Sequence, residues 1–136
     1  MKCPMLVLGS LMVLGAGVTA LLVPRPGQNE ISPESALKLQ RPLWVDARGA
    51  DDFAQGAMPG ALLLNEDNWP RSIATVLEQW HPGRPIIVYC GSLSCSASQA
   101  VAKRLRGEEY GLAPVYVLRG GWDVLKARLA EASQRQ

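Results

Sequence analysis

The sequence predicts an α/β domain with a mostly parallel sheet of about four or five strands and helices on both faces of the sheet. Two observations carry this prediction. Short apolar runs rich in β-branched residues alternate with longer stretches in which apolar residues recur at helical spacing. Turns that contain glycine and proline separate the two kinds of segment. Strands that alternate with helices form βαβ units, and such units build parallel sheets.

Length and composition bound the function. The chain has 136 residues, enough for one domain, and its 48% apolar and 19% charged residues suit a globular fold with an added hydrophobic segment. A net charge of +2 without a clustered basic face predicts no binding to nucleic acid. Three cysteines are too few for a disulfide framework. His81, Cys90 and Cys95 lack the spacing of a metal site, so neither a metal nor a cofactor is predicted.

The N-terminal segment 1–24 is mostly apolar, carries no charged side chain other than Lys2, and predicts a membrane-spanning helix. Residues 5–23 would extend over about 28 Å as a helix, close to the thickness of a bilayer's hydrocarbon core. A cleaved signal peptide is the alternative, with Val18-Thr19-Ala20 as its cleavage site, although the apolar run continues beyond it. The favoured prediction is a single-pass anchor with the domain on the extracytoplasmic side, the periplasm in a bacterium. Cleavage would instead give a secreted domain.

A linker over residues 25–31, rich in proline, glycine and polar residues, leads into one domain over residues 32–136. Ser32 followed by proline and glutamate is typical of a helix start. The other elements follow from apolar spacing and turns. Strands are predicted at 43–45, 61–64, 86–89 and 114–118, and helices at 32–39, 50–55, 72–80, from 96 onward and at 122–132.

Residues 85–100 carry the clearest chemistry. A buried strand at 86–89 is followed by Cys90, a loop of small and mostly polar residues, and an amphipathic helix. Ligands bind at the carboxyl edge of an open α/β sheet. Inward-facing N–H groups of a tight loop and the positive end of a helix favour an anion there, and a thiolate is an anion. We therefore expect Cys90 to be a nucleophile at neutral pH, with a buried structural cysteine as the alternative.

Four short motifs occur in order on the predicted strands and turns. They are Val45-Asp46-Ala47-Arg48, Gly56-Ala57-Met58-Pro59-Gly60-Ala61, Val88-Tyr89-Cys90 and Gly120-Gly121-Trp122. In this order and spacing they resemble the motifs of single-domain rhodaneses, and the resemblance runs from Ile31 to about Leu129. It implies that Cys90 takes up sulfane sulfur as a persulfide and that backbone N–H groups of the following loop bind this anion. The loop residues are Gly91, Ser92, Leu93, Ser94, Cys95 and Ser96.

The chain departs from the family's pattern in its charge. Single-domain members commonly carry arginine five residues after the catalytic cysteine, and this chain carries Cys95 there. No basic side chain stands in residues 91–96, so an anionic donor would be held by backbone amides and the helix end alone. The missing arginine also argues against phosphatase activity, which depends on charge stabilisation.

Three further side chains near Cys90 need an interpretation. Asp46 and Arg48 are predicted to be a structural pair that orders the end of a strand beside the site, with a direct role in the site as the alternative. Cys95 is either a small residue that fills the helix start or a second redox thiol that resolves chemistry on Cys90. A disulfide requires Cα atoms within about 7 Å and facing Cβ atoms, and the sequence leaves the side-chain direction open.

The prediction for function is a sulfurtransferase or persulfide carrier in which Cys90 takes sulfur from a small donor and passes it to a thiol acceptor. Membrane contact is through residues 5–23, and no protein partner is specified. Two alternatives stay open. One is a rhodanese-fold binding module without catalysis, and the other is a thiol–disulfide redox protein that uses Cys90 and Cys95.

Overall fold

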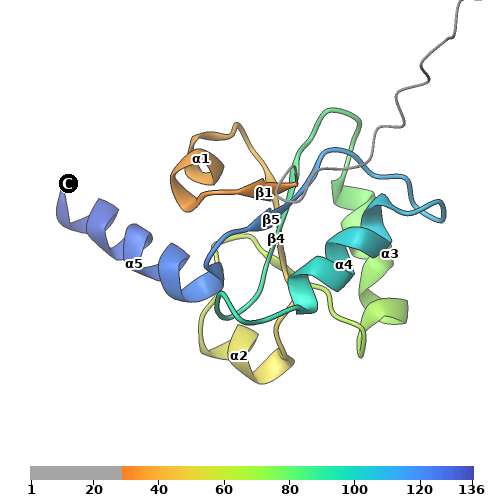
Figure 1. The fold of residues 1–136 in the computed structure, drawn as a ribbon, viewed down its shortest axis with the longest axis horizontal. Coiled ribbons are helices and arrows are strands. Elements are labelled where there is room, and N and C mark those ends of the chain that lie inside the picture. The colour runs from red at the N-terminus through yellow and green to blue at the C-terminus, as the bar shows by residue number, and fades with distance from the viewer. Residues whose placement is uncertain (1–28) are drawn as a thin grey trace, which may run out of the picture.

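The computed structural model describes residues 29–136, in which a central sheet lies between helices (Figure 1). The elements in chain order are β1 (Glu30–Ile31), α1 (Pro33–Lys38), β2 (Leu43–Asp46), α2 (Ala50–Gln55), β3 (Leu62–Leu63), α3 (Trp69–Gln79), β4 (Ile86–Tyr89), α4 (Ala97–Arg106), β5 (Val115–Leu118) and α5 (Gly121–Gln134). No helix of this part of the chain has the length and apolar character to cross a bilayer. The segment 1–24, predicted as an anchor or signal peptide, lies outside the described residues.

The sheet has five parallel strands in the order β1-β5-β4-β2-β3, which confirms the predicted parallel sheet. β4 is central, and its Val88 pairs with Val45 of β2 on one side and Val117 of β5 on the other. Because parallel strands end at the same edge, the residues that follow β2, β4 and β5 meet there. This edge is where a ligand is expected in an open α/β sheet.

Alternate residues of the central strand face two separate cores, as the pleat of a strand requires. Ile86 and Val88 pack with residues of α3 and α4, whereas Ile87 and Tyr89 pack with residues of α1 and α5. All four are fully buried. The helices therefore cover both faces of the sheet, as predicted, and α2 lies at one end of it without a buried residue (Figure 1).

Two elements differ from the prediction. Glu30 and Ile31, predicted as the end of the linker, form the edge strand β1. This strand is held by hydrogen bonds such as the one from Arg119 N–H to the Ile31 carbonyl (2.9 Å), so it needs no apolar pattern of its own. α3 begins at Trp69 rather than at residue 72, because proline suits the first turn of a helix. The other predicted bounds agree within two residues.

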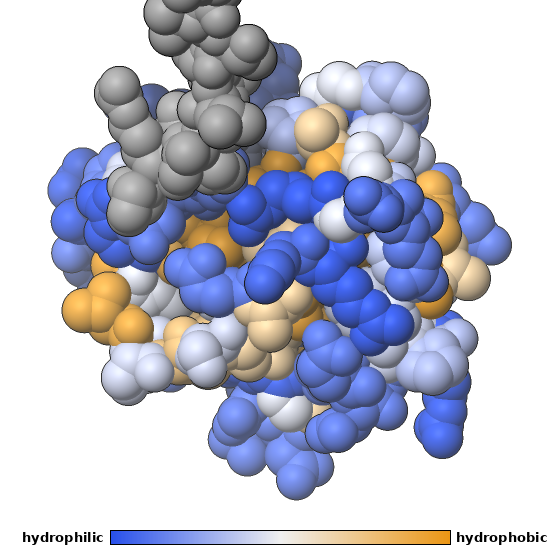
Figure 2. Space-filling view, turned by 45° about the vertical axis from the view of Figure 1, so that its right-hand side comes forward, coloured by the Kyte–Doolittle hydropathy of each residue, from blue (hydrophilic) through white to orange (hydrophobic). Residues whose placement is uncertain are grey.

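The face of the molecule that carries α3 and α4 is mainly hydrophilic (Figure 2). Figure 2 brings the side of α3 and α4 forward and shows apolar residues there only in small, separate groups. Leu93, at 79% exposure, is the most exposed large apolar side chain of residues 29–136. It lies in the loop between β4 and α4 that follows Cys90.

Candidate functional site

Cys90 directly follows the central strand and is held in place by the start of α5. Its carbonyl oxygen accepts a hydrogen bond of 2.7 Å from Trp122 N–H, and the Gly91 carbonyl accepts one of 3.1 Å from Asp123 N–H. A Cβ atom on Gly121 would lie 2.6 Å from the Cys90 carbonyl oxygen, and the φ angle of Gly121 is +63°. Only glycine permits both this close approach and this backbone conformation. Cys90 itself is 4% exposed.

The loop over residues 91–96 folds back so that a disulfide joins Cys95 to Cys90, with the two Cα atoms 6.1 Å apart. Cys95 N–H donates to the Ser92 carbonyl at 3.2 Å, and the hydroxyls of Ser92 and Ser94 lie 3.1 Å apart. The Cys95 side chain therefore points toward Cys90, a direction that the sequence left open. One of the loop amides expected to bind an anion is engaged in this turn instead.

Both cysteines line a small cavity of about 140 Å³, called here the disulfide cavity. Its other lining residues come from β1, the β4–α4 loop, the first turn of α4, and the end of β5 with the turn that follows: Glu30, Ser92, Leu93, Ser98, Gln99, Val117, Leu118, Arg119 and Gly120. The N-terminus of α4 contributes its positive dipole end. Arg119, 58% exposed, contributes a full positive charge and lies 3.5 Å from the Glu30 carboxylate.

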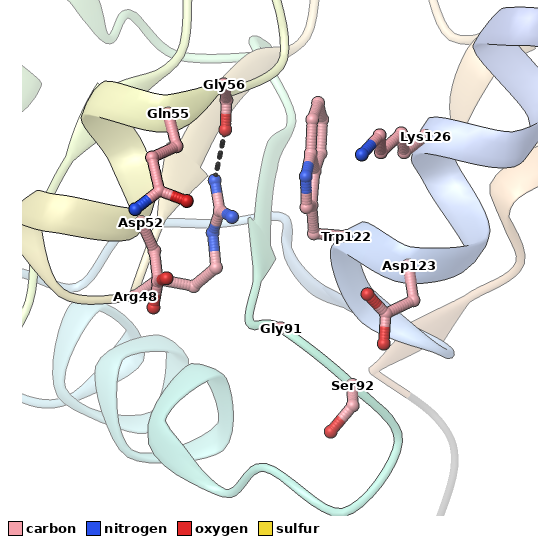
Figure 3. A pocket seen from close by; sticks show the side chains of 9 residues that line it. All are labelled: Arg48, Asp52, Gln55, Gly56, Gly91, Ser92, Trp122, Asp123 and Lys126. Atoms are coloured by element: carbon pink, nitrogen blue, oxygen red, sulfur yellow. Dashed lines mark hydrogen bonds between the residues drawn. The ribbon is translucent and has the colours of Figure 1, made fainter.

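Asp46 and Arg48 form a buried ion pair beside Cys90. Arg48 Nη2 donates to Asp46 Oδ2 at 2.7 Å, and its Nε and backbone N–H donate to the same carboxylate. The side chain of Arg48 is 8% exposed and that of Asp46 is fully buried. The hydrogen bond to Asp46 raises the pKa of the Arg48 guanidinium above its ordinary value. Arg48 also donates to the Gly56 carbonyl at 2.7 Å, so it ties the end of β2 to the end of α2 (Figure 3).

Two aromatic rings cover the Arg48 guanidinium. Its Cζ atom lies 5.1 Å from the centre of the Trp122 ring and 5.7 Å from that of Tyr89, and the two rings stack with centres 5.9 Å apart. The Tyr89 hydroxyl accepts a hydrogen bond of 3.1 Å from Met58 N–H. Burial raises the pKa of this hydroxyl above its ordinary value. Trp122 is half-buried, packs against the core that contains Tyr89 and Leu125, and places its ring beside Arg48.

A second cavity of about 440 Å³, called here the Arg48 cavity, opens between α2, the loop after Cys90 and α5 (Figure 3). Its charged lining residues are Arg48, Lys126, Asp52 and Asp123. Because Arg48 is paired with Asp46, the only other positive charge of this lining is that of Lys126, and the carboxylates of Asp52 and Asp123 offset it. Ser92 lines this cavity as well as the disulfide cavity.

A family model for the rhodanese-like domain matches residues 32–128. The chain belongs to the rhodanese-like domain family. No curated protein matches the chain significantly.

Solved structures show the same fold at low sequence identity. A rhodanese-like domain protein from Staphylococcus aureus has a TM-score of 0.54 and 21% identity, over 71% of this chain and 90% of that one. A rhodanese-related protein from Thermoplasma volcanium has a TM-score of 0.57 and 13% identity, over 74% and 92%. A thiosulfate sulfurtransferase from Pseudomonas aeruginosa has a TM-score of 0.52 and 21% identity, over 74% of this chain and 18% of that one.

Arg119 is a residue of the disulfide cavity that was not identified from the sequence of this rhodanese-like domain. A positive charge was expected at the site only from the backbone, yet Arg119 lines the disulfide cavity. It follows β5, which lies beside β4 in the sheet. The signal was present, because a basic residue directly after a predicted strand is a candidate for the carboxyl edge. What the sequence lacked was the order of the strands, which decides whether β5 lies next to Cys90.

Proposed function

We propose that this rhodanese-like domain is a sulfurtransferase or persulfide carrier in which Cys90 takes up sulfane sulfur. The observation that carries the proposal is the placement of Cys90. It directly follows the central strand of the sheet, its backbone is fixed by α5, and it lines a cavity large enough for a few atoms of a donor. A cysteine with only a packing role would need no cavity at its sulfur.

The charges around the disulfide cavity favour an anionic donor. Arg119 and the positive end of α4 both lie at this cavity, whereas the Arg48 cavity carries Asp52 and Asp123 beside its cations. An anion therefore meets a more favourable field at the disulfide cavity. The carboxylate of Glu30, 3.5 Å from Arg119, reduces this field without cancelling the helix contribution.

The first step is a displacement on the donor by the reduced form of Cys90. With thiosulfate as the example, the Cys90 thiolate attacks the outer, sulfane sulfur, and a new S–S bond forms to Cys90. The S–S bond of thiosulfate breaks, and sulfite leaves with its electron pair. In the second step the thiolate of an acceptor attacks the outer sulfur of the persulfide, and Cys90 leaves as a thiolate.

The test measures the product that leaves the donor. The full-length chain is reduced, freed of reductant and mixed with thiosulfate or, in a parallel sample, mercaptopyruvate. We expect one equivalent of sulfite or pyruvate per chain, and none from Cys90→Ser. Ser133→Ala, which removes an exposed hydroxyl near the end of α5, serves as the matched control and keeps the product. If neither donor yields product with the wild-type chain, sulfur uptake by Cys90 is wrong, which leaves a binding module without catalysis and a thiol–disulfide redox protein.

The Cys90–Cys95 disulfide favours a second candidate function, a thiol–disulfide redox protein. Such a protein would exchange its disulfide with a dithiol and would not need a sulfur donor. The same samples separate the two functions. Reversible reduction by dithiothreitol without any release of sulfite or pyruvate supports the redox protein, and release of either product supports sulfur uptake.

We also propose that residues 5–23 anchor the domain to a membrane, with the domain on the extracytoplasmic side. An oxidising compartment of this kind is where disulfides persist, which agrees with the Cys90–Cys95 pair. Membrane fractionation followed by N-terminal sequencing tests this point. Recovery of the intact N-terminus in the membrane fraction supports the anchor, and an N-terminus at Leu21 in the soluble fraction would show that the segment is a cleaved signal peptide.

A further inference from the structure

We propose that Cys95 is a resolving thiol that converts the Cys90 persulfide into the Cys90–Cys95 disulfide and releases sulfide. This inference rests on the proposed uptake of sulfur by Cys90. It differs from simple carriage, because the sulfur leaves as sulfide when no acceptor thiol is at hand. The chain then needs a dithiol reductant before it can react again.

The backbone already holds the two sulfurs within bonding reach. The backbone of Cys90 is fixed by a hydrogen bond of 2.7 Å from Trp122 N–H to its carbonyl oxygen. Cys95 is brought forward by the turn in which its N–H donates to the Ser92 carbonyl. The separation of 6.1 Å between the two Cα atoms lies within the usual range for disulfides, so the pair closes with the sheet and α4 in place.

The surroundings of the two sulfurs differ, and this difference assigns their roles. Cys90 is 4% exposed, and Cys95 is half-buried beside the exposed side chain of Leu93. An incoming dithiol therefore reaches Cys95 first and forms its mixed disulfide there, which frees Cys90 as the leaving thiolate. The buried cysteine is thus returned in the reduced form that attacks the next donor.

The resolving step balances without an outside oxidant. The Cys95 thiolate attacks Sγ of the persulfidated Cys90, and the Sγ–Sγ bond forms. The bond from Cys90 Sγ to the outer sulfur breaks, and hydrosulfide leaves with the electron pair. Two thiols are oxidised by two electrons in total, and the sulfane sulfur is reduced to sulfide by the same two electrons. A dithiol of the dithiothreitol or thioredoxin class then supplies two electrons to reopen the disulfide.

The test is a single turnover of the full-length chain in a Cys3→Ser background, so that only Cys90 and Cys95 contribute thiols. The reduced chain receives one equivalent of thiosulfate, and sulfite, sulfide, free thiols and intact mass are measured. We expect the parent chain to release one sulfide, lose both thiols and gain no sulfur atom. Cys95→Ser should release sulfite equally well but retain the mass of one sulfur atom, with sulfide at least about tenfold lower.

A displaced thiol provides the matched control. Cys95→Ser combined with Ala100→Cys keeps two thiols but places the second one on the exposed side of α4, outside the disulfide cavity. We expect this variant to behave like Cys95→Ser, because position and not the mere presence of a thiol decides.

The outcomes are distinguishable from those of the proposed function. A stable persulfide on both the parent chain and Cys95→Ser, with no sulfide, overturns the resolving role and leaves sulfur uptake intact. Equal sulfide release from the parent and the displaced-thiol variant also overturns it. Absence of sulfite from every variant, together with absence of pyruvate from the mercaptopyruvate samples, overturns sulfur uptake itself and the resolving role with it.

Discussion

The backbone N–H of Trp122 donates a hydrogen bond of 2.7 Å to the carbonyl oxygen of Cys90. This contact joins the first turn of the last helix to the end of the central strand. Asp123 N–H makes the same kind of bond to the Gly91 carbonyl. Two of the amides that begin α5 are therefore engaged by the backbone of the site, so α5 positions the loop after Cys90.

This contact predicts a large effect of Gly121→Ala. The new Cβ would lie 2.6 Å from the Cys90 carbonyl oxygen, and it would also impose strain at φ +63°. We expect a loss of about 2–5 kcal/mol in the free energy of unfolding, the sum of about 1–2 for the left-handed backbone and about 1–3 for the overlap. Urea unfolding followed by tryptophan fluorescence measures this loss.

Gly111→Ala is the matched control for Gly121→Ala. Its φ angle is +60°, and nothing lies within 4 Å of a Cβ built there. It should therefore lose only the backbone part, about 1–2 kcal/mol. Equal losses in the two variants would mean that the contact with Cys90 does not constrain the site.

The buried pair of Asp46 and Arg48 predicts that removing one partner is costly. Asp46→Ala leaves the Arg48 guanidinium without its carboxylate in a site where both side chains are under 10% exposed. We expect unfolding to become easier by about 3–5 kcal/mol. Glu66→Gln, which breaks the exposed pair with Arg104, should change stability by less than about 1 kcal/mol. Comparable losses from the two variants would contradict a structural role for the buried pair.

Tyr89 predicts a loss of stability in alkaline solution. Burial raises the pKa of its hydroxyl above the ordinary value, which is about 10. The folded chain keeps this proton where the unfolded chain releases it. The contribution is therefore complete below about pH 10 and is lost as the pH rises further, by about 1.4 kcal/mol per pH unit. Urea unfolding of the oxidised chain over a pH series measures the slope.

Tyr89→Phe removes the titrating group and should flatten this alkaline slope. At neutral pH it should also lose about 1 kcal/mol, because Met58 N–H loses its acceptor. Ile87→Val, a change on the same strand β4 that removes no titrating group, is the control and should keep the slope of the parent chain. An unchanged slope in Tyr89→Phe would show that another group governs the alkaline transition.

Arg119 predicts which cavity receives an anionic donor. Arg119→Gln should slow sulfite formation from thiosulfate about three- to tenfold and reduce its dependence on salt, since the charge is exposed and screened. Glu30→Gln should have the opposite effect, because its carboxylate opposes the same field. Lys126→Gln alters only the Arg48 cavity and should leave the rate unchanged. If Lys126→Gln slowed sulfite formation while Arg119→Gln kept the rate of the parent chain, the donor would be assigned to the Arg48 cavity instead.

Much of the fold could be predicted from the sequence because local patterns decide it. The central strand, Ile86–Tyr89, is continuously apolar because both of its faces are buried, and α1 starts at Ser32, whose hydroxyl accepts from Ser35 N–H. β1 was missed for the opposite reason. It has two residues, and its partner on β5 lies more than eighty residues further along the chain.

The candidate site was predictable in its centre and unpredictable at its rim. Cys90 follows from a strand, a loop and a helix that are contiguous in sequence. Arg119 lies at the site because β5 is next to β4 in the sheet, and Trp122 lies there because α5 begins against Cys90. Both residues are about thirty positions away from Cys90 in the sequence. The direction of Cys95 depends on how a loop of small residues turns, and several turns are compatible with such residues.

The edge strand β1 has a consequence for where a partner can approach. Glu30 belongs to β1 and lines the disulfide cavity, so this edge strand lies beside Cys90 and Cys95. Residues 24–29, even fully extended, span only about 20 Å. If residues 5–23 lie in a bilayer, as proposed, the disulfide cavity would stay within about this distance of the lipid headgroups. Acceptors or reductants embedded in the same membrane would then meet it by lateral diffusion in two dimensions, and bulky soluble proteins would be hindered by the membrane itself.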